Sequence, residues 1–163
     1  MAAAVGSPVR PVLNSPEQIA RWRAAGGGPC DLMIDTGMNR LGLDPHDLSA
    51  DLLDGLQIHT LLSHLACADE DHAHNDQQLS AFREIAGRIP AQRYSLANSA
   101  GILLGSDYAF DLTRPGLALY GGIARPEAVG GIAQVVYPHA QILQVRRVRA
   151  GESVGYGATY IAA

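Results

Sequence analysis

Short apolar runs alternate with amphipathic segments between residues 9 and 120. Strand-like runs occur at residues 9–13, 30–34, 56–64, 93–97 and 111–119. Helices are expected between these runs, opening at Ser15, running from Asp44 to Leu53 and from Leu79 to Ile89, and opening again at Ser99. Close alternation of strands and helices is typical of a parallel α/β fold. The pattern predicts roughly five strand–helix units, fewer than the eight of a closed barrel.

Two of these helices carry clear local signals. Ser15 is a good N-cap, Pro16 suits the first helical position, and Gln18 completes a capping box. Around Phe82, apolar residues recur at helical spacing, at positions 79, 82, 85, 86 and 89. A polar loop is expected before this second helix, as far as Asn75.

The pattern changes after Gly121. Residues 123–134 resemble a linker that contains glycine and proline, and residues 135–149 alternate between apolar and polar positions as in a strand with one wet face. Residues 154–161 are expected to continue in strand. We therefore divide the chain into an α/β domain (1–122), a linker (123–134) and the beginning of a β-rich domain (135–163), because one hairpin is not stable alone.

Composition narrows the class of protein. The chain has 163 residues, 47% hydrophobic and 17% charged, with a formal net charge of −4 and a mean hydropathy of +0.03. These values are typical of a soluble globular protein and give no sign of a nucleic-acid or membrane partner. No signal peptide is expected, so the cytoplasm is the default location. All 12 basic side chains are arginine, so the chain has no lysine.

Two stretches favour an anionic ligand. Residues 97–101 place Asn98 and Ser99 at a helix start, where unpaired N–H groups attract anions. Residues 114–117 combine a permanent cation, Arg114, with Gly116, which allows a ligand to approach the backbone. A capped helix and an ordinary turn would explain either stretch alone. Together they favour a phosphorylated small molecule.

Three further segments have more than one interpretation. Tyr156 is flanked by glycines, which suits either a proton-transfer residue or a strand aromatic beside a bulge. Residues 63–74 contain three histidines, a cysteine and acids, so a metal-dependent hydrolase is an alternative, although short-spaced metal motifs are absent. The loop 35–40 ends in Arg40, which could pair with a carboxylate.

Five motifs, in order along the chain, resemble those of alanine racemase, a family that uses pyridoxal 5′-phosphate. They are IDTGMNRLG (34–42), SHLACADE (63–70), SLANSAG (95–101), RPGLALYG (114–121) and VGYGATY (154–160). The resemblance extends from about residue 11 onward. It implies the later part of a (β/α)8 TIM-type barrel followed by the first strands of a C-terminal β domain. It also implies interconversion of L- and D-alanine by two bases, a tyrosine and a lysine.

The resemblance assigns the cofactor contacts residue by residue. Ser99 and the backbone of Gly116 and Leu117 match part of the phosphate cradle, and Asn98 lies beside it. Arg114 matches the arginine that binds the pyridine nitrogen. A permanent cation there would keep that nitrogen unprotonated and limit side reactions.

The remaining roles concern the substrate and the second base. His64 matches a group that steadies Arg114, and Arg40 matches the arginine near the substrate carboxylate. Tyr156 matches the catalytic tyrosine, which in this family works at the partner subunit's site, so a homodimer is implied. No metal is implied.

The sequence departs from the family in one important respect. The lysine that holds the cofactor lies upstream of the matching region, and no lysine here replaces it. Met33 and Ser95 stand where some members have a modified lysine and a histidine. We expect the chain to be an internal part of an alanine racemase that is inactive alone. The alternative is a non-catalytic protein that binds pyridoxal phosphate or is a remnant of such a protein.

Overall fold

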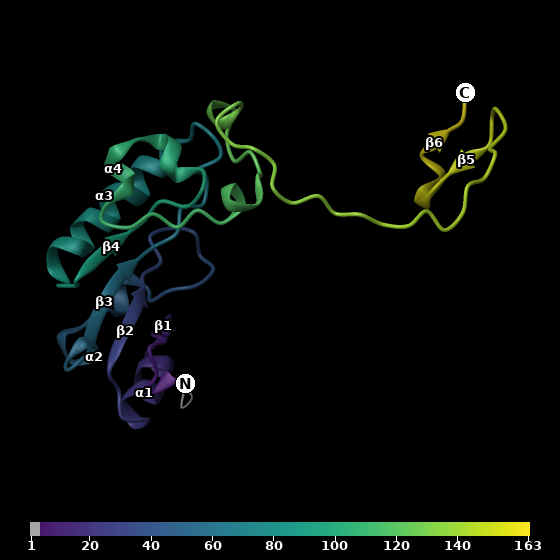
Figure 1. The fold of residues 1–163 in the computed structure, drawn as a ribbon. Coiled ribbons are helices and arrows are strands. Elements are labelled where there is room, and N and C mark those ends of the chain that lie inside the picture. The colour runs from purple at the N-terminus through teal and green to yellow at the C-terminus, as the bar shows by residue number, and fades with distance from the viewer. Residues whose placement is uncertain (1–3) are drawn as a thin grey trace.

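The computed structural model describes residues 4–163, and its centre is one parallel sheet (Figure 1). The four strands are paired in the order β1-β2-β3-β4, with β1 at Val12–Leu13, β2 at Pro29–Met33, β3 at Gln57–Leu62 and β4 at Arg93–Ser95. The register aligns Leu32 with Leu13 on one side and with Leu61 on the other. The predicted parallel α/β architecture is confirmed.

The helices begin where short polar side chains satisfy free N–H groups. In α1 (Pro16–Ala24), the Ser15 hydroxyl accepts from the Gln18 N–H at 3.3 Å. The Gln18 side chain bonds back to the Asn14 N–H at 2.7 Å instead of Ser15, so the predicted capping box is shifted by one residue.

The helix expected over residues 44–53 is two short pieces. Asp44 caps η2 (Pro45–Asp47), and Ser49 then caps α2 (Ala50–Leu53), so a second cap interrupts the expected helix. The long helix α3 spans Ala73–Arg88 and begins earlier than expected, because the His72 ring accepts from the His74 N–H. No helix among residues 4–163 is long and apolar enough to cross a membrane.

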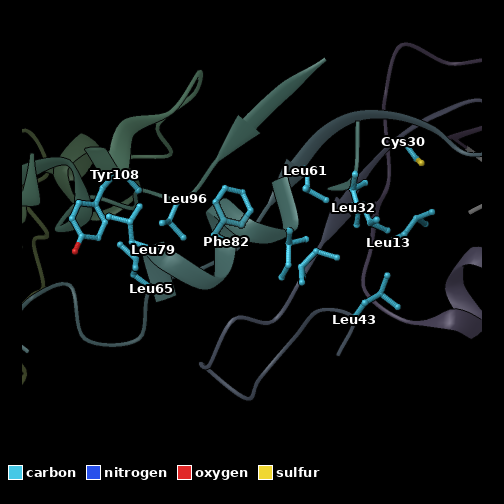
Figure 2. Close-up of a cluster of buried hydrophobic side chains, with 14 of the residues drawn as sticks. Leu13, Cys30, Leu32, Leu43, Leu61, Leu65, Leu79, Phe82, Leu96 and Tyr108 are labelled. Atoms are coloured by element: carbon cyan, nitrogen blue, oxygen red, sulfur yellow. The ribbon is translucent and has the colours of Figure 1, made fainter. Parts of the chain in front are cut away.

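The core lies between the sheet and α3. In the view of Figure 2, Phe82 of α3 lies between Leu61 of β3 and Leu96, and Leu13 and Leu32 lie farther along the same buried cluster. Phe82 is fully buried, and its ring meets the Phe110 ring edge-to-face with centroids 5.0 Å apart. The predicted apolar face of α3 is therefore the face that holds the helix to the sheet.

The fifth expected strand, residues 111–119, is wrong. Only a single bridge joins Asn98 to Arg114, and Leu117–Tyr120 form the short helix η4. Pro115 has no N–H to donate, so the ladder cannot continue beyond Arg114. The preceding helix at Ser99 is also modified: it is a 3-10 turn, η3 (Gly101–Leu104), followed by α4 (Ser106–Ala109).

The C-terminal segment forms less strand than its pattern predicts. Residues 133–149 carry no assigned helix or strand, and almost all of their side chains are exposed. An extended segment becomes a strand only when a partner takes up its backbone hydrogen bonds, and the described residues offer it none. The expected strand 135–149 is therefore wrong for this structure.

The expected strand over residues 154–161 is a small hairpin. Its strands are β5 (Ser153–Val154) and β6 (Tyr160–Ile161), which pair antiparallel. Between them, the turn η6 (Tyr156–Ala158) has Gly157 at φ 72°, a left-handed conformation that glycine adopts without strain. The chain leaves η5 (Pro126–Ala128) and runs extended to this hairpin, away from the sheet (Figure 1).

Candidate functional site

A cavity of about 470 Å³ opens at the carboxyl ends of β3 and β4. Its volume lies in the range usual for small-molecule sites. Its lining contains six of the residues singled out from the sequence, with Asp69 as an additional acid: His64, Asn98, Ser99, Arg114, Gly116 and Leu117. Leu117, Ile123 and Ala124 add apolar surface. The loops after neighbouring parallel strands meet here because all four strands point the same way.

Arg114 is held from three sides. Its guanidinium donates to the Ser95 hydroxyl and to the Ser63 carbonyl, and its backbone N–H donates to the Ala97 carbonyl at 2.9 Å. Burial lowers the pKa of Arg114, but a guanidinium starts so high that it stays charged. The cavity therefore contains a fixed cation whose direction is set by β3 and β4.

Ser99, on the loop after β4, is bonded to the backbone of residues 116–118. Its hydroxyl oxygen accepts from the N–H groups of Gly116, at 3.0 Å, and Ala118, at 3.2 Å. A serine hydroxyl with both acceptor positions used still has its own O–H to donate. Leu117 is the first residue of η4, where an N–H has no partner within the helix. The Ser99 O–H and the Leu117 N–H are thus two donors that an anion in this cavity could use.

Asn98 has a structural role beside these donors. Its side-chain oxygen accepts from the N–H of Gly101, the first residue of η3, at 2.9 Å. The N-cap residue of η3 is Ala100, so Asn98 satisfies a free N–H at this helix start without being the predicted cap. Ser99, the other predicted cap, turns instead toward Gly116 and Ala118.

His64 is half-buried between two cations. Burial lowers its pKa first, and the charges of Arg114 and Arg40 lower it further. The ring is therefore neutral at pH 7. Within residues 4–163 its side chain makes no hydrogen bond to Arg114, so Ser63 and Ser95 hold that guanidinium while His64 lines the cavity beside it.

Arg40 lies on the loop after β2, outside the cavity lining. The loop is shaped by Asp35, whose carboxylate accepts from the N–H groups of Gly37 and Met38 at 2.8 Å and of Arg40 at 3.1 Å. Burial alone would raise the pKa of Asp35, but the backbone N–H groups of the loop outweigh it and lower the pKa. The Arg40 side chain is exposed, yet its charge reaches His64.

Replacing Asp35 with asparagine tests this loop. We expect Asp35→Asn to lower the free energy of unfolding by about 1–2 kcal/mol at pH 7, because charge-assisted bonds become neutral ones. A lowered folded-state pKa stabilises the protein above the unfolded pKa and is lost as the pH falls through the folded pKa. The difference between variant and wild type should therefore disappear in acid, as measured by urea unfolding at successive pH values. A difference independent of pH would contradict the assignment.

Tyr156 is not brought to the cavity. It lies in the turn of the C-terminal hairpin, fully exposed, between β5 and β6. The alternative of a strand aromatic beside a bulge is wrong, because the residue belongs to a 3-10 turn.

Comparison with known proteins decides the family. A sequence profile described as "Alanine racemase, N-terminal domain" matches residues 1–124. The chain belongs to the alanine racemase family. It is 48% identical to an alanine racemase of Rhodospirillum rubrum and 46% identical to one of Rhizobium meliloti, over 93% and 91% of its length.

Solved alanine racemases have the same fold as this chain. A structure from Bartonella henselae, described with covalently bound pyridoxal phosphate, superimposes with a TM-score of 0.74 at 37% identity, over 94% of this chain and 46% of that one. The biosynthetic enzyme from Pseudomonas aeruginosa gives 0.74 at 38% identity, over 93% and 45%. The chain covers 44% and 42% of the two relatives from Rhodospirillum and Rhizobium, so it spans less than half of their length.

Two of the three histidines that suggested a metal hydrolase have other partners in this structure. His72 caps α3, and the His74 ring lies 3.0 Å from the Gly37 carbonyl. Among residues 4–163, no three His, Cys, Asp or Glu side chains are grouped closely enough to hold a metal ion. The described part of the chain thus gives the hydrolase alternative no support.

Sequence reasoning missed four residues that build this site. They are the hydrogen-bonding partners behind the cavity: Thr36, Ser63, Gln78 and Ser95. One signal was available, because Gln78 is polar yet lies four residues before Phe82, on the apolar face of α3. A polar residue on such a face is usually satisfied inside the protein.

Proposed function

We propose that this chain forms the cofactor pocket of an alanine racemase that interconverts L- and D-alanine with pyridoxal 5′-phosphate. One observation carries the proposal: a single cavity joins the Ser99 hydroxyl and the Leu117 N–H to the half-buried cation Arg114. This arrangement matches a phosphorylated aromatic ring, with an anion at one end and an acceptor nitrogen at the other. The family membership, shown independently, supports the same ligand.

The residues present fit that ligand. The Ser99 O–H is free to donate, and a side chain at Gly116 would meet only open space, so the backbone there is accessible. Arg114 has donors but no acceptor, and it suits an unprotonated ring nitrogen. Asp69 is the acid in the lining.

The chain's own residues then have distinct tasks. When bound, pyridoxal phosphate supplies an electron-withdrawing ring that stabilises negative charge at the substrate's α-carbon. Arg114 keeps a hydrogen bond, and not a transferable proton, at the ring nitrogen. His64, neutral at pH 7, leaves Arg114 and Arg40 as the cations of the site. Arg40 would hold the substrate carboxylate.

Tyr156 would move the α-proton. Its exposure on a hairpin suits a residue that enters the site of a partner subunit in a cytoplasmic homodimer. In this proposal residues 1–122 belong to a (β/α)8 barrel, 123–134 link it to the next domain, and 135–163 begin a β domain. The partner would supply the neighbours that the exposed strand-like segment lacks.

The phosphate end can be tested with Ser99→Ala. We expect the purified chain to bind pyridoxal phosphate and the variant to bind it about tenfold more weakly, because one donor to the anion is lost. Absorbance titration measures the affinity. Ser80→Ala, which removes an exposed hydroxyl from α3, is the matched control and should bind like wild type. Equal affinities for Ser99→Ala and wild type would contradict the proposed cradle.

The lack of lysine favours a second candidate, a non-catalytic pyridoxal-phosphate-binding protein. No side-chain amine in these 163 residues can form the covalent link to the cofactor. We therefore expect borohydride to trap no cofactor on a side chain, and the chain alone to leave L-alanine unracemised. Sustained racemisation by the purified chain would overturn this expectation. A longer polypeptide that adds a lysine and racemises alanine would exclude the second candidate.

A further inference from the structure

Gln78 is a fully buried amide whose three polar bonds all reach the loops of the site. Its Oε1 accepts from the Ala66 N–H at 2.8 Å. Its Nε2 donates to the His64 carbonyl at 3.0 Å and to the Thr36 hydroxyl at 3.2 Å. One side chain of α3 thus connects the loop after β2 with the loop after β3.

These bonds continue toward both arginines. The Thr36 hydroxyl lies 2.7 Å from the Ser63 hydroxyl, and the Ser63 carbonyl accepts from the Arg114 guanidinium. On the other side, Thr36 follows Asp35, the residue that shapes the loop carrying Arg40. The Gln78 amide and the hydroxyls of Thr36 and Ser63 each have a hydrogen-bonding partner, which makes the arrangement rigid.

We propose that Gln78 is a positioning residue that sets the distance between Arg114, His64 and Arg40 by holding the two loops together. The expected effect on pyridoxal-phosphate binding rests on the proposed function. Glutamine suits the task because its amide offers two donors and an acceptor without a charge. A charged side chain at this fully buried position would lose its hydration at a high cost.

Asn75 is a second buried side-chain amide on α3, and its hydrogen bonds do not reach the site. The amide donates to the carbonyls of Cys67 and Glu70, both at 3.0 Å. These bonds shape the far part of the loop and reach neither the loop after β2 nor Arg114. Asn75→Leu therefore removes two side-chain hydrogen bonds from the same helix and Gln78→Leu removes three, and only the second removes the connection to the site.

The test compares the purified 163-residue chain with Gln78→Leu, Thr36→Val and Asn75→Leu. NMR titration measures the pKa of the His64 ring, assigned with His64→Gln. Absorbance titration measures binding of pyridoxal phosphate, and competition measures binding of inorganic phosphate. The groups that face His64 are Arg114, Arg40 and Asp69, and all of them are retained in every variant.

We expect Gln78→Leu to raise the pKa of His64 toward its ordinary value, because looser loops admit water and separate the ring from both cations. Pyridoxal phosphate should bind about tenfold more weakly, since Arg114 is displaced. Inorganic phosphate should bind as in wild type, because Ser99 and the backbone of residues 116–118 are held by other elements. Thr36→Val, a smaller change, should shift both readouts in the same direction, and Asn75→Leu should shift neither.

The outcomes are separable. If Gln78→Leu and Asn75→Leu share one His64 pKa and one ratio of pyridoxal-phosphate to phosphate affinity, Gln78 is merely structural and the inference is overturned. If Gln78→Leu does not fold, Thr36→Val decides by the same readouts. If wild type does not bind pyridoxal phosphate, the proposed ligand is wrong for this chain, while the His64 titration still decides the positioning role.

Discussion

Replacing Arg114 with leucine should weaken pyridoxal-phosphate binding by roughly 10- to 100-fold, which is the loss expected for one charge-assisted hydrogen bond. The variant also leaves the Ser63 carbonyl and the Ser95 hydroxyl without their donor. Inorganic phosphate, which needs only the Ser99 end, should be affected much less. Absorbance titration for the cofactor and competition for phosphate measure the two affinities.

Two further variants make the Arg114 experiment specific. Arg114→Lys keeps the charge but lacks the planar fork that reaches Ser63 and Ser95 together, so its affinity should lie between wild type and leucine. Arg93→Leu removes an exposed arginine at the start of β4 and should bind like wild type. Wild-type affinity in Arg114→Leu would show that the cation does not contact the cofactor.

Truncating Phe82 should have the largest effect on stability. We expect Phe82→Ala to lower the free energy of unfolding by about 3–5 kcal/mol, because it leaves a cavity between α3 and the sheet. The edge-to-face contact with Phe110 is lost as well, and such a pair contributes about 0.5–1.5 kcal/mol beyond buried area. A domain of this size has only about 5–15 kcal/mol in total.

Urea unfolding followed by Trp22 fluorescence measures this change, because the single tryptophan is buried on α1. Phe82→Leu, which retains most of the volume, should cost less. Leu119→Ala removes a side chain that is 67% exposed and should change stability by less than about 0.5 kcal/mol. An unchanged midpoint in Phe82→Ala would contradict the core assignment.

The alternation of apolar runs predicted four of the strands and their parallel arrangement. It failed for residues 111–119 and 135–149, for one physical reason. Hydrophobic pattern records which side chains can be buried, whereas a strand also needs a neighbour for its N–H and C=O groups. Pro115 removes a donor in the first segment, and the described residues offer no partner strand to the second.

The site, like the fold, was determined partly by the sequence and partly by the tertiary structure. The sequence alone determined the α/β class, the family motifs around Ser99 and Arg114, and the absence of lysine, because these depend on residue types and local spacing. Only the tertiary structure decided that Ser63 and Ser95 hold Arg114, that Ser99 turns to Gly116, and that Gln78 joins two loops. Those bonds connect segments far apart in the chain. Polar groups that become buried need hydrogen-bonding partners, and the local sequence does not show which distant residues will be those partners.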